Sequence, residues 1–580
     1  MEGLCEGVVG AIGWVAQAWI IGCVLGALAL LWLVRDVYTT LSIPSISVPL
    51  TAAEASDTLN GAAYDPSKPV DKDLVPCYDP ATMQLLGHVP AMSETEVRAI
   101  IKKAKAAQAV WKSSPFSQRR KLLRILLKFV VENQEEICRV TARDTGKVMT
   151  EGLLGEIITT CEKIHWLVDH AEKYLQPEHR SPGLLAFFKA PRVEYVPVGV
   201  VGAIVPWNWP FHNLLNPVTA AVFTGNAIVI KVSEHASWAA QYHGRVLKAA
   251  LAAAGAPEDL VQIVTGFGEA GNAIVTGGAD KVIFVGSTQI GKKVMAAAAA
   301  TLTPVVLELG GKDPFIVLDD ADVKPVIQVA IKAAFLNSGQ NCAGGERFFV
   351  HNKVLDQFVE GVVSVVKQMR QGPPLGHGDM DTGSMTMPGL PQKVQGLVDD
   401  AVAKGAKLLA GGKLPASTLA GTGNFYPPTV LLGIKRGMLI WEEEVFGPVM
   451  SIIGFDTDDE VVVAMANDCE FGLGSNVFGG QARARRMCER LEAGMSTIND
   501  FATTYMAQSL PSGGVKTSGY MAQSLPFGGV KSSGFDRFAG IEGLRGLCHA
   551  KAVSEDAVPW LMRSSIPPPW QVGQEQGLGA

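Results

Sequence analysis

The chain lacks several features that mark particular classes of protein. Its nine cysteines form no CxxC pair and are odd in number, which indicates neither a disulfide framework nor a zinc or other metal site. It has no Asn-x-Ser/Thr sequon. Fifty Lys and Arg against 56 Asp and Glu give a net charge of −6, without the basic excess of a nucleic-acid-binding domain. We therefore expect a reducing compartment and no nucleic-acid partner.

Charge is also missing from a long N-terminal stretch. Residues Val8 to Val34 carry no charged side chain, and a helix needs about 20 apolar residues to cross a bilayer. A signal peptide would instead have a shorter apolar region after a basic start, whereas Glu2 and Glu6 lead here. We favour an uncleaved anchor that contacts the lipid bilayer through residues 8–34. Arg35 after the span favours a single-pass protein of the endoplasmic reticulum or another endomembrane, with its C-terminal bulk in the cytosol.

Beyond the anchor, the pattern of apolar residues changes along the chain. Helical periodicity runs through residues 93–175, and short apolar runs alternate with helix-length segments from 194 to 309. The expected strands are Val198–Val205, Ala227–Val232, Leu260–Val264, Val282–Val285 and Pro304–Leu309. This alternation predicts an α/β fold with a doubly wound parallel sheet, whose ligands bind beyond the carboxyl ends of the strands.

Two glycine motifs compete for a nucleotide phosphate within that region. Gly266, Gly268 and Gly271 have the GxGxxG spacing, but no acidic residue follows at about 20 positions. In "FVGSTQIG", a strand runs directly into Gly286 and Ser287 before a helix start, which is a suitable anion site. A tight turn also explains either motif.

A polar loop around Cys342 poses a different question. It reads "NSGQNCAGGE" over residues 337–346, unlike the apolar surroundings of a structural cysteine. Flexible residues allow a ligand to approach and leave backbone N–H groups near the sulfur, which suits a thiolate nucleophile. The alternative is a loop cysteine without a chemical role.

Seven motifs then occur in one order: "PWNWP", "IKVSEHAS", "GSTQIG", "ELGGKDP", "GQNCAG", "EEEVFGPV" and "LPFGGVKSSG". Over roughly residues 60–550 the chain resembles aldehyde dehydrogenases. It looks most like the membrane-anchored plant family 22 members, with which it shares text similar to "AAVFTGN", "KVSEHASW" and "FAGIEGLR". The resemblance implies two doubly wound parallel-sheet domains, a small oligomerisation β-extension and a homodimer or homotetramer.

The resemblance also implies a division of the chain. The expected segments are an anchor (1–40), a linker (41–60), an NAD-binding domain (61–175 and 198–309), an oligomerisation β-extension (176–197 and 536–555), a catalytic domain (310–535) and a C-terminal tail (556–580).

Three residues take catalytic roles by resemblance: Cys342 as nucleophile, Asn208 in the oxyanion hole and Glu308 as general base. A thiolate adds to an aldehyde carbon, preorganised donors hold the resulting oxyanion, and a carboxylate activates the water that releases an acid. Each residue also has a structural alternative. Asn208 could cap a turn, Glu308 could pair with Lys312, and Glu444 could belong to a solvated acidic run.

For the cofactor NAD, the resemblance places Lys231 and Glu234 near the adenosine ribose, where a carboxylate repels the 2′-phosphate of NADP. Glu444 matches the position that binds the nicotinamide ribose, accompanied by Phe446. The full expected cofactor site is Lys231, Glu234, Gly286, Ser287, Gly291, Glu444, Phe446, Pro206 and Trp207.

The expected activity is oxidation of a small-molecule aldehyde to the free acid, because relatives that form a coenzyme A thioester lack the glutamate matched by Glu308. The anchor favours apolar aldehydes that partition into lipid. A semialdehyde substrate, or a membrane-anchored scaffold without activity, remains an alternative.

One feature departs from the family pattern. Residues 505–519 are followed at once by a near-copy at 520–534, and the family has a single copy. The second copy keeps Phe527, where the family places an aromatic residue in the substrate tunnel, while the first offers Ser512. We expect residues 526–529 to lie beside the Cys342 loop, and most of 505–519 to form an insertion that costs little closure entropy.

Overall fold

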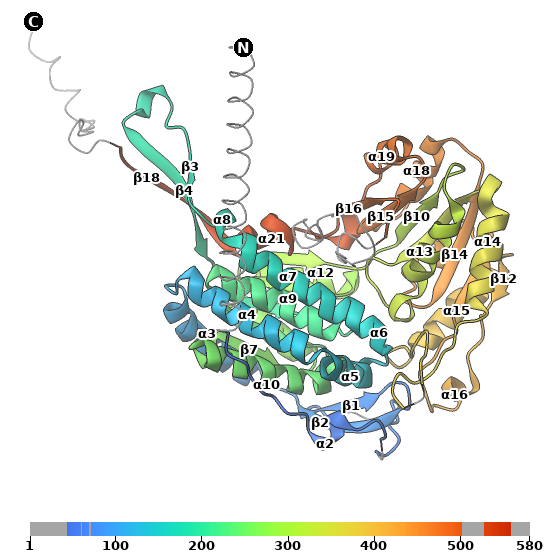
Figure 1. The fold of residues 1–580 in the computed structure, drawn as a ribbon, viewed down its shortest axis with the longest axis horizontal. Coiled ribbons are helices and arrows are strands. Elements are labelled where there is room, and N and C mark those ends of the chain that lie inside the picture. Colours follow the sequence, from blue (N-terminus) through green and yellow to red (C-terminus); the bar gives the residue numbers. More distant parts are fainter. Residues whose placement is uncertain (1–42, 60, 69–70, 377, 502–526, 558–580) are drawn as a thin grey trace, which may run out of the picture.

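The computed structural model describes residues 43–59, 61–68, 71–376, 378–501 and 527–557. The chain forms two lobes that lie side by side (Figure 1). One lobe is built on a six-stranded sheet in the order β17-β9-β8-β5-β6-β7, and the other on a seven-stranded sheet in the order β12-β13-β14-β11-β10-β15-β16. The expected α/β class with two parallel-sheet domains is confirmed.

The strands of the first sheet coincide with the apolar runs of the sequence. They are β5 (Val200–Ile204), β6 (Ala227–Lys231), β7 (Val261–Val264), β8 (Lys281–Val285) and β9 (Val305–Glu308), all paired in parallel. Every residue of β6 is buried, since helices cover both faces of the sheet. At one edge, β17 (Gly534–Phe535) adds antiparallel to β9, although the expected catalytic segment extended to 535.

Helices cover this sheet on both sides. Those between its strands are α9 (Pro210–Thr224), α10 (Ser237–Ala254), α11 (Gly268–Thr276) and α12 (Thr288–Ala299). The N-terminal helices are α3 (Glu94–Trp111), α4 (Phe116–Glu132), α5 (Gln134–Thr145), α6 (Met149–Gly152), α7 (Thr159–Trp166) and α8 (Glu172–Tyr174). Two π-helical stretches, η1 (Leu153–Ile158) and η2 (Leu167–Ala171), join α6, α7 and α8. Such stretches are frequent at functional sites, and η1 borders the cavity described below.

The second sheet begins directly after β9. Its strands are β10 (Asp313–Val317), β11 (Gly345–His351), β12 (Lys407–Ala410), β13 (Thr429–Leu432), β14 (Val449–Phe455), β15 (Gly474–Phe478) and β16 (Met495–Ile498). All pairs are parallel except β12 with β13. The main helices of this lobe are α13 (Val323–Phe335), α14 (Asn352–Val366), α15 (Leu390–Ala403), α18 (Asp459–Asn467) and α19 (Gln481–Cys488).

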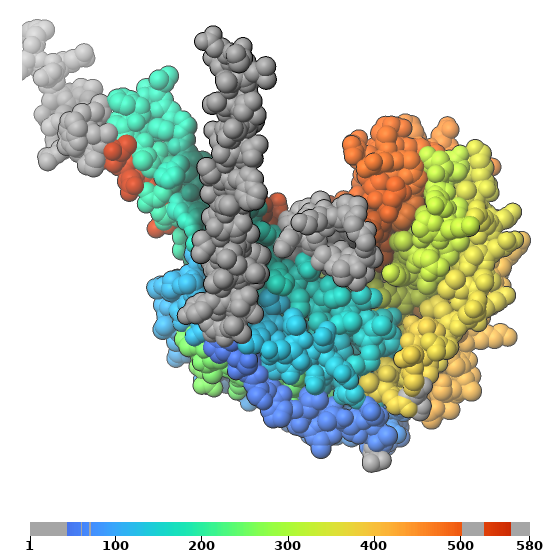
Figure 2. Space-filling model, in the orientation of Figure 1, coloured from blue at the N-terminus to red at the C-terminus, as the bar shows by residue number. Residues whose placement is uncertain are grey.

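A third, three-stranded sheet projects away from both lobes (Figures 1 and 2). It consists of β3 (Glu178–His179), β4 (Lys189–Pro197) and β18 (Cys548–Asp556), with β18 antiparallel to β4. Only the second half of the expected segment 536–555 is a strand, because α21 (Gly540–Gly546) precedes it and buries Leu544 in the core of the first lobe.

The N-terminal part of the described chain packs against the first lobe. Residues 43–50 of the expected linker place Ile43, Ile46, Val48 and Leu50 against its core. They are followed by α2 (Ala52–Ala55) and by the hairpin of β1 (Leu74–Asp79) and β2 (Gln84–Pro90).

Several expectations fall on parts of the chain outside the described residues: the anchor at 8–34, the first repeat copy at 505–519, residues 520–526 of the second copy, and the C-terminal tail from 558. Among the residues that the structure does describe, no helix has the length and apolar character needed to cross a bilayer.

Candidate active site

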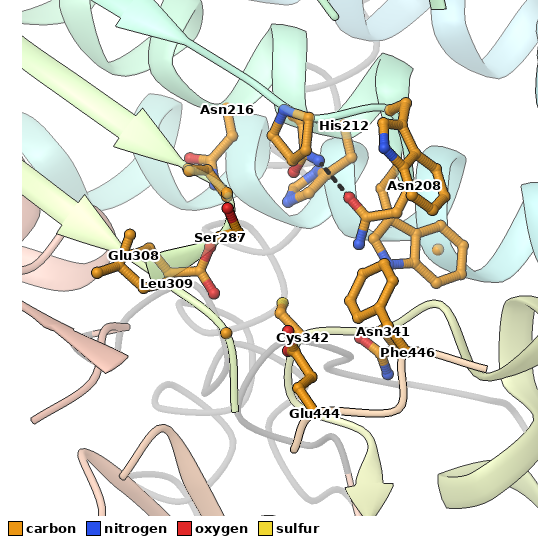
Figure 3. Close-up of a pocket in the computed structure, with 18 of the residues that line it drawn as sticks. Asn208, His212, Asn216, Ser287, Glu308, Leu309, Asn341, Cys342, Glu444 and Phe446 are labelled. Atoms are coloured by element: carbon orange, nitrogen blue, oxygen red, sulfur yellow. Dashed lines mark hydrogen bonds between the residues drawn. The ribbon is translucent and has the colours of Figure 1, made fainter. Parts of the chain in front are cut away.

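A cavity of about 340 Å³ lies where the two lobes meet. Both lobes supply its lining, including Pro206, Trp207, Asn208, Trp209, His212, Asn216, Gly286, Ser287, Glu308, Cys342, Lys393, Glu444, Phe446, Phe527 and Phe538. In Figure 3, the sulfur of Cys342 points into this cavity between Glu308 on one side and Asn208 on the other. The three expected catalytic residues therefore share one cavity.

The Cys342 loop is held in an unusual backbone conformation. Asn337, Ser338 and Gly339 all have positive φ (56°, 54° and 71°), which non-glycine residues rarely adopt. The backbone N–H of Asn337 donates to the carboxylate of Glu151 over 2.7 Å, and the Ser338 hydroxyl donates to the carbonyl of Gly383 over 3.1 Å. These contacts offset the strain and direct the chain into β11.

Burial controls the charges at the centre of the site. It raises the pKa of Glu308 to about 8, helped by the nearby negative charge of Glu444 and opposed by a hydrogen bond with Cys342. Burial, and in addition the negative charge of Glu308 and of the other carboxylates nearby, raises the pKa of the Cys342 thiol well above its usual value. The thiol and the carboxylate are thus neighbours between which a proton can pass.

Asn208 follows β5 and is fixed from several sides. Its carbonyl accepts hydrogen bonds from the Lys147 ammonium at 2.7 Å and from the Asn337 amide at 2.8 Å. Its side-chain oxygen accepts from the Asn213 amide at 3.2 Å, and its NH₂ group donates to the carbonyl of Gln340 at 3.3 Å. The amide is therefore held as a donor near Cys342 instead of capping a turn.

Lys147 was not expected from the sequence. It is fully buried, pairs with Glu156 at 2.5 Å and lies 4.1 Å from the centre of the Trp209 ring. Trp209 in turn packs flat on Gly155, where a Cβ atom would be 2.1 Å from the ring. No short-range pattern links residue 147 to residue 208, so only the folded chain reveals this support.

Glu444 approaches the site because Gly310 makes room for it. Its carboxylate accepts from the backbone N–H of Gly311 at 3.0 Å, and a Cβ atom on Gly310 would lie 2.6 Å from it. A Cβ atom on Gly311 would meet the Cys342 carbonyl at 2.6 Å. Burial raises the pKa of Glu444 to about 7. Glu444 is half-buried with its carboxylate held on the backbone of Gly311, so it is not part of a solvated acidic face.

The segment around Glu444 has its own support, which the sequence did not indicate. The carboxylate of Glu346 accepts from the backbone N–H groups of Val445 and Phe446 at 3.0–3.1 Å. Lys312 donates to the same carboxylate at 2.6 Å. The partner of Lys312 is therefore Glu346 and not Glu308.

Residues expected to bind the cofactor line one side of the cavity. Gly286 and Ser287 follow β8, and Ser287 precedes α12 without its side chain capping the first turn. The N–H groups of that turn remain available to an anion. Trp207 and Phe446 meet edge to face, with ring centroids 5.6 Å apart.

Three other expected cofactor residues lie outside the cavity lining. Lys231 ends β6 and pairs with Glu234 at 3.2 Å. Gly291 lies in α12, where a Cβ atom would be 2.6 Å from Leu309, so it allows helix-to-strand packing. In the competing motif, Gly266 packs against the backbone of Met92 and does not line the cavity either.

Phe527 of the second repeat copy lies beside the nucleophile. It is 7 % exposed and shares a small apolar cluster with Ala343, Leu473, Met495 and Ala539, against which Cys342 and Phe538 pack. Its ring meets that of Phe538 edge to face at 5.0 Å.

Comparison with known proteins places this arrangement in a family. The profile of the aldehyde dehydrogenase family matches residues 67–525. An aldehyde dehydrogenase-like protein of Saccharomyces cerevisiae is 38% identical over 516 residues, which cover 86% of this chain and 77% of the yeast protein.

Solved structures agree with that assignment. The NAD⁺ complex of an aldehyde dehydrogenase from Bacillus cereus has a TM-score of 0.74 and 31% identity. The alignment covers 83% of this chain and 93% of the Bacillus chain. An NADP-dependent enzyme of E. coli has a TM-score of 0.75 and 30% identity. The alignment covers 83% of this chain and 95% of the E. coli chain. The chain belongs to the aldehyde dehydrogenase family and is an oxidoreductase that acts on aldehydes.

Proposed function

We propose that the protein oxidises an aldehyde to the carboxylic acid with NAD, through a thiohemiacetal and a thioester on Cys342. The observation that carries the proposal is the convergence of Cys342, Glu308 and Asn208 on one cavity. This constellation supplies a nucleophile, a base and an oxyanion donor for one carbonyl group.

In the first half of the reaction, the Cys342 thiol loses its proton to solvent and the sulfur attacks the aldehyde carbon. The Asn208 side-chain amide, together with the Cys342 backbone N–H, stabilises the oxyanion of the thiohemiacetal. Lys147 and Asn337 act on this step by positioning the Asn208 backbone. When bound, NAD accepts the hydride that leaves this carbon, and the thioester remains on Cys342.

In the second half, Glu308 as carboxylate takes a proton from water, and the hydroxide attacks the thioester. The carbon–sulfur bond breaks, the acid leaves and Cys342 recovers its proton. The elevated pKa of Glu308, about 8, makes it a stronger base than an exposed glutamate. Its place at the cavity favours transfer of the acyl group to water over transfer to a coenzyme A thiol.

The residues present fit a dinucleotide. The carboxyl ends of β6 and β8 carry Lys231–Glu234 and Gly286–Ser287, and ligands of open parallel sheets bind at such ends. The half-exposed carboxylate of Glu234 would accept from ribose hydroxyls and repel a 2′-phosphate. We therefore propose NAD rather than NADP, and comparable kcat/KM values for the two would contradict this.

Further proposals come from the sequence alone. We propose that the protein belongs to the membrane-anchored plant family 22 subgroup, is held at an endomembrane through residues 8–34 with its catalytic lobes in the cytosol, and acts on apolar aldehydes. The exposed outer strand β18 supports assembly into a dimer or tetramer by strand pairing.

The test is a rate screen of the purified full chain in detergent, with NAD and aldehydes of graded length and charge. Formation of NADH and acid with apolar aldehydes, absent in Cys342→Ala, is the expected result. A chain that binds aldehyde or NAD without producing NADH would instead be a scaffold, and a preference for short, charged semialdehydes would reject the apolar class.

A further inference from the structure

The cavity has one polar wall that the proposed chemistry does not use. His212 and Asn216 lie four residues apart on α9, so they share one face of that helix, and both line the cavity. Much of the remaining lining is apolar and aromatic, including Trp209, Phe527 and Phe538. Figure 3 shows both side chains on the far side of the cavity from Cys342.

The carboxamide of Asn216 has no hydrogen-bond partner among the residues that the structure describes. Its oxygen is buried without a donor, and no hydrogen bond to its NH₂ group is found in that part of the chain. Asn216 as a whole is only 5 % exposed. A buried polar group without a partner costs free energy, and an amide that lines a ligand cavity is free to be satisfied by the ligand.

His212 is held in place and uncharged. Its Nδ1 atom lies 3.1 Å from the Thr160 hydroxyl, and its backbone N–H donates to Glu156 at 2.9 Å. Burial, with a smaller effect of the Lys163 charge, lowers the pKa of His212 to about 3, so the imidazole is neutral at physiological pH. No hydrogen bond to Nε2 is found within the described residues.

The charge at this wall decides the class of ligand. A neutral imidazole and a neutral amide give hydrogen bonds but no countercharge for a carboxylate. The ammonium of Lys393, which also lines the cavity, donates to the carbonyl of Glu444 at 2.9 Å, on the side of the expected cofactor residues.

We propose that Asn216, with His212, forms a specificity subsite for an uncharged hydroxyl on the aldehyde substrate. This inference rests on the proposed aldehyde oxidation and makes its substrate an amphipathic hydroxyaldehyde. A hydroxyl donates to the Asn216 oxygen and accepts from a neighbouring N–H. Because Asn216 lies across the cavity from Cys342 (Figure 3), the hydroxyl sits away from the aldehyde carbon on the substrate chain.

The test compares decanal with 6-, 8- and 10-hydroxydecanal as substrates of the full chain with NAD, measured as kcat/KM. We expect one hydroxyl position to raise kcat/KM about 10-fold or more over decanal. That ratio should fall to about 1 in Asn216→Leu and in the smaller Asn216→Ala, which guards against a folding defect in either. Asn272→Leu, the same change at an exposed position on α11 outside the cavity, should keep the wild-type ratio.

Two results overturn the inference while leaving the proposed function intact: turnover of all four aldehydes without a hydroxyl preference, or a preference that persists in both Asn216 variants. Failure of every aldehyde to yield NADH would reject the proposed function itself.

Discussion

The two large sheets contribute to the site from opposite ends of their strands. In the first sheet, Asn208 and Gly286 follow β5 and β8, and Glu308 is the last residue of β9. In the second sheet, Cys342 and Glu444 precede β11 and β14. The carboxyl ends of one sheet thus face the loops at the amino ends of the other (Figure 1). In the proposed reaction, the carbonyl would lie between Glu308 and Asn208 from one lobe and Cys342 from the other.

This difference has a physical consequence for rigidity. Side chains at the ends of buried parallel strands are held rigidly by the sheet. Glu308 is an example, since only 2 % of its surface is exposed. Groups in loops need added support, and the second lobe provides it through the strained Asn337–Gly339 turn and through the Glu346 carboxylate under Phe446. Substitutions in the two lobes should therefore lower activity in different ways.

The largest effect is expected from the second lobe. Cys342→Ala removes the proposed nucleophile, so NADH formation should fall by at least about 10⁴-fold. Cys488→Ala, which removes a free cysteine of α19 in the same lobe, should leave the rate near wild type. Equal rates for the two variants would refute the covalent role.

The first lobe should show a smaller, graded effect. Asn208→Ala removes an oxyanion donor and should lower kcat by about 10² to 10³ with little change in KM. Lys147→Met, which removes the support under Asn208 but not the donor itself, should cost less in kcat. A loss for Lys147→Met that exceeds the loss for Asn208→Ala would show that Lys147 has a role beyond positioning.

The dependence of kcat on pH should follow the ionisation of Glu308. Because its pKa is raised to about 8, the carboxylate needed as base is the minority form at pH 7, and kcat should rise about tenfold per unit below pH 8 and level off above it. Glu308→Gln should lose this dependence. A flat wild-type profile from pH 6 to 9 would contradict the assignment.

The smallest effect is expected from the tandem repeat. Deleting residues 505–519 should keep activity, since Phe527 beside Cys342 belongs to the second copy. Deleting 520–534, the matched control of equal length, should abolish it. An inactive first deletion alongside an active second one would assign the site to the first copy.

Sequence reasoning succeeded where the information is local. The strands of the first sheet follow from apolar runs of the right length. Cys342, Glu308 and Asn208, chosen from motifs in a recognisable order, line one cavity, and their catalytic roles stay predictions. It failed where contacts span distant segments: Lys147 lies 61 residues from Asn208, and Glu346 lies 99 from Val445. Ion pairs and backbone contacts of this kind depend on tertiary packing, which no short window records.

Asn216 illustrates the same limit. A buried asparagine in a helix could find a hydrogen-bond partner in many ways, and only the folded chain reveals that its oxygen has no donor among the described residues. Likewise, the reason for two successive glycines at 310 and 311 is visible only from the atoms that approach them.

The most direct test of the account is the mass of Glu308→Gln, quenched in acid within one turnover after mixing with NAD and an apolar aldehyde. Because acylation precedes the water step, the variant should release about one NADH per site and carry the acyl group on the peptide that contains Cys342. NADH release without this adduct, or an adduct on a different residue, would contradict the central claim.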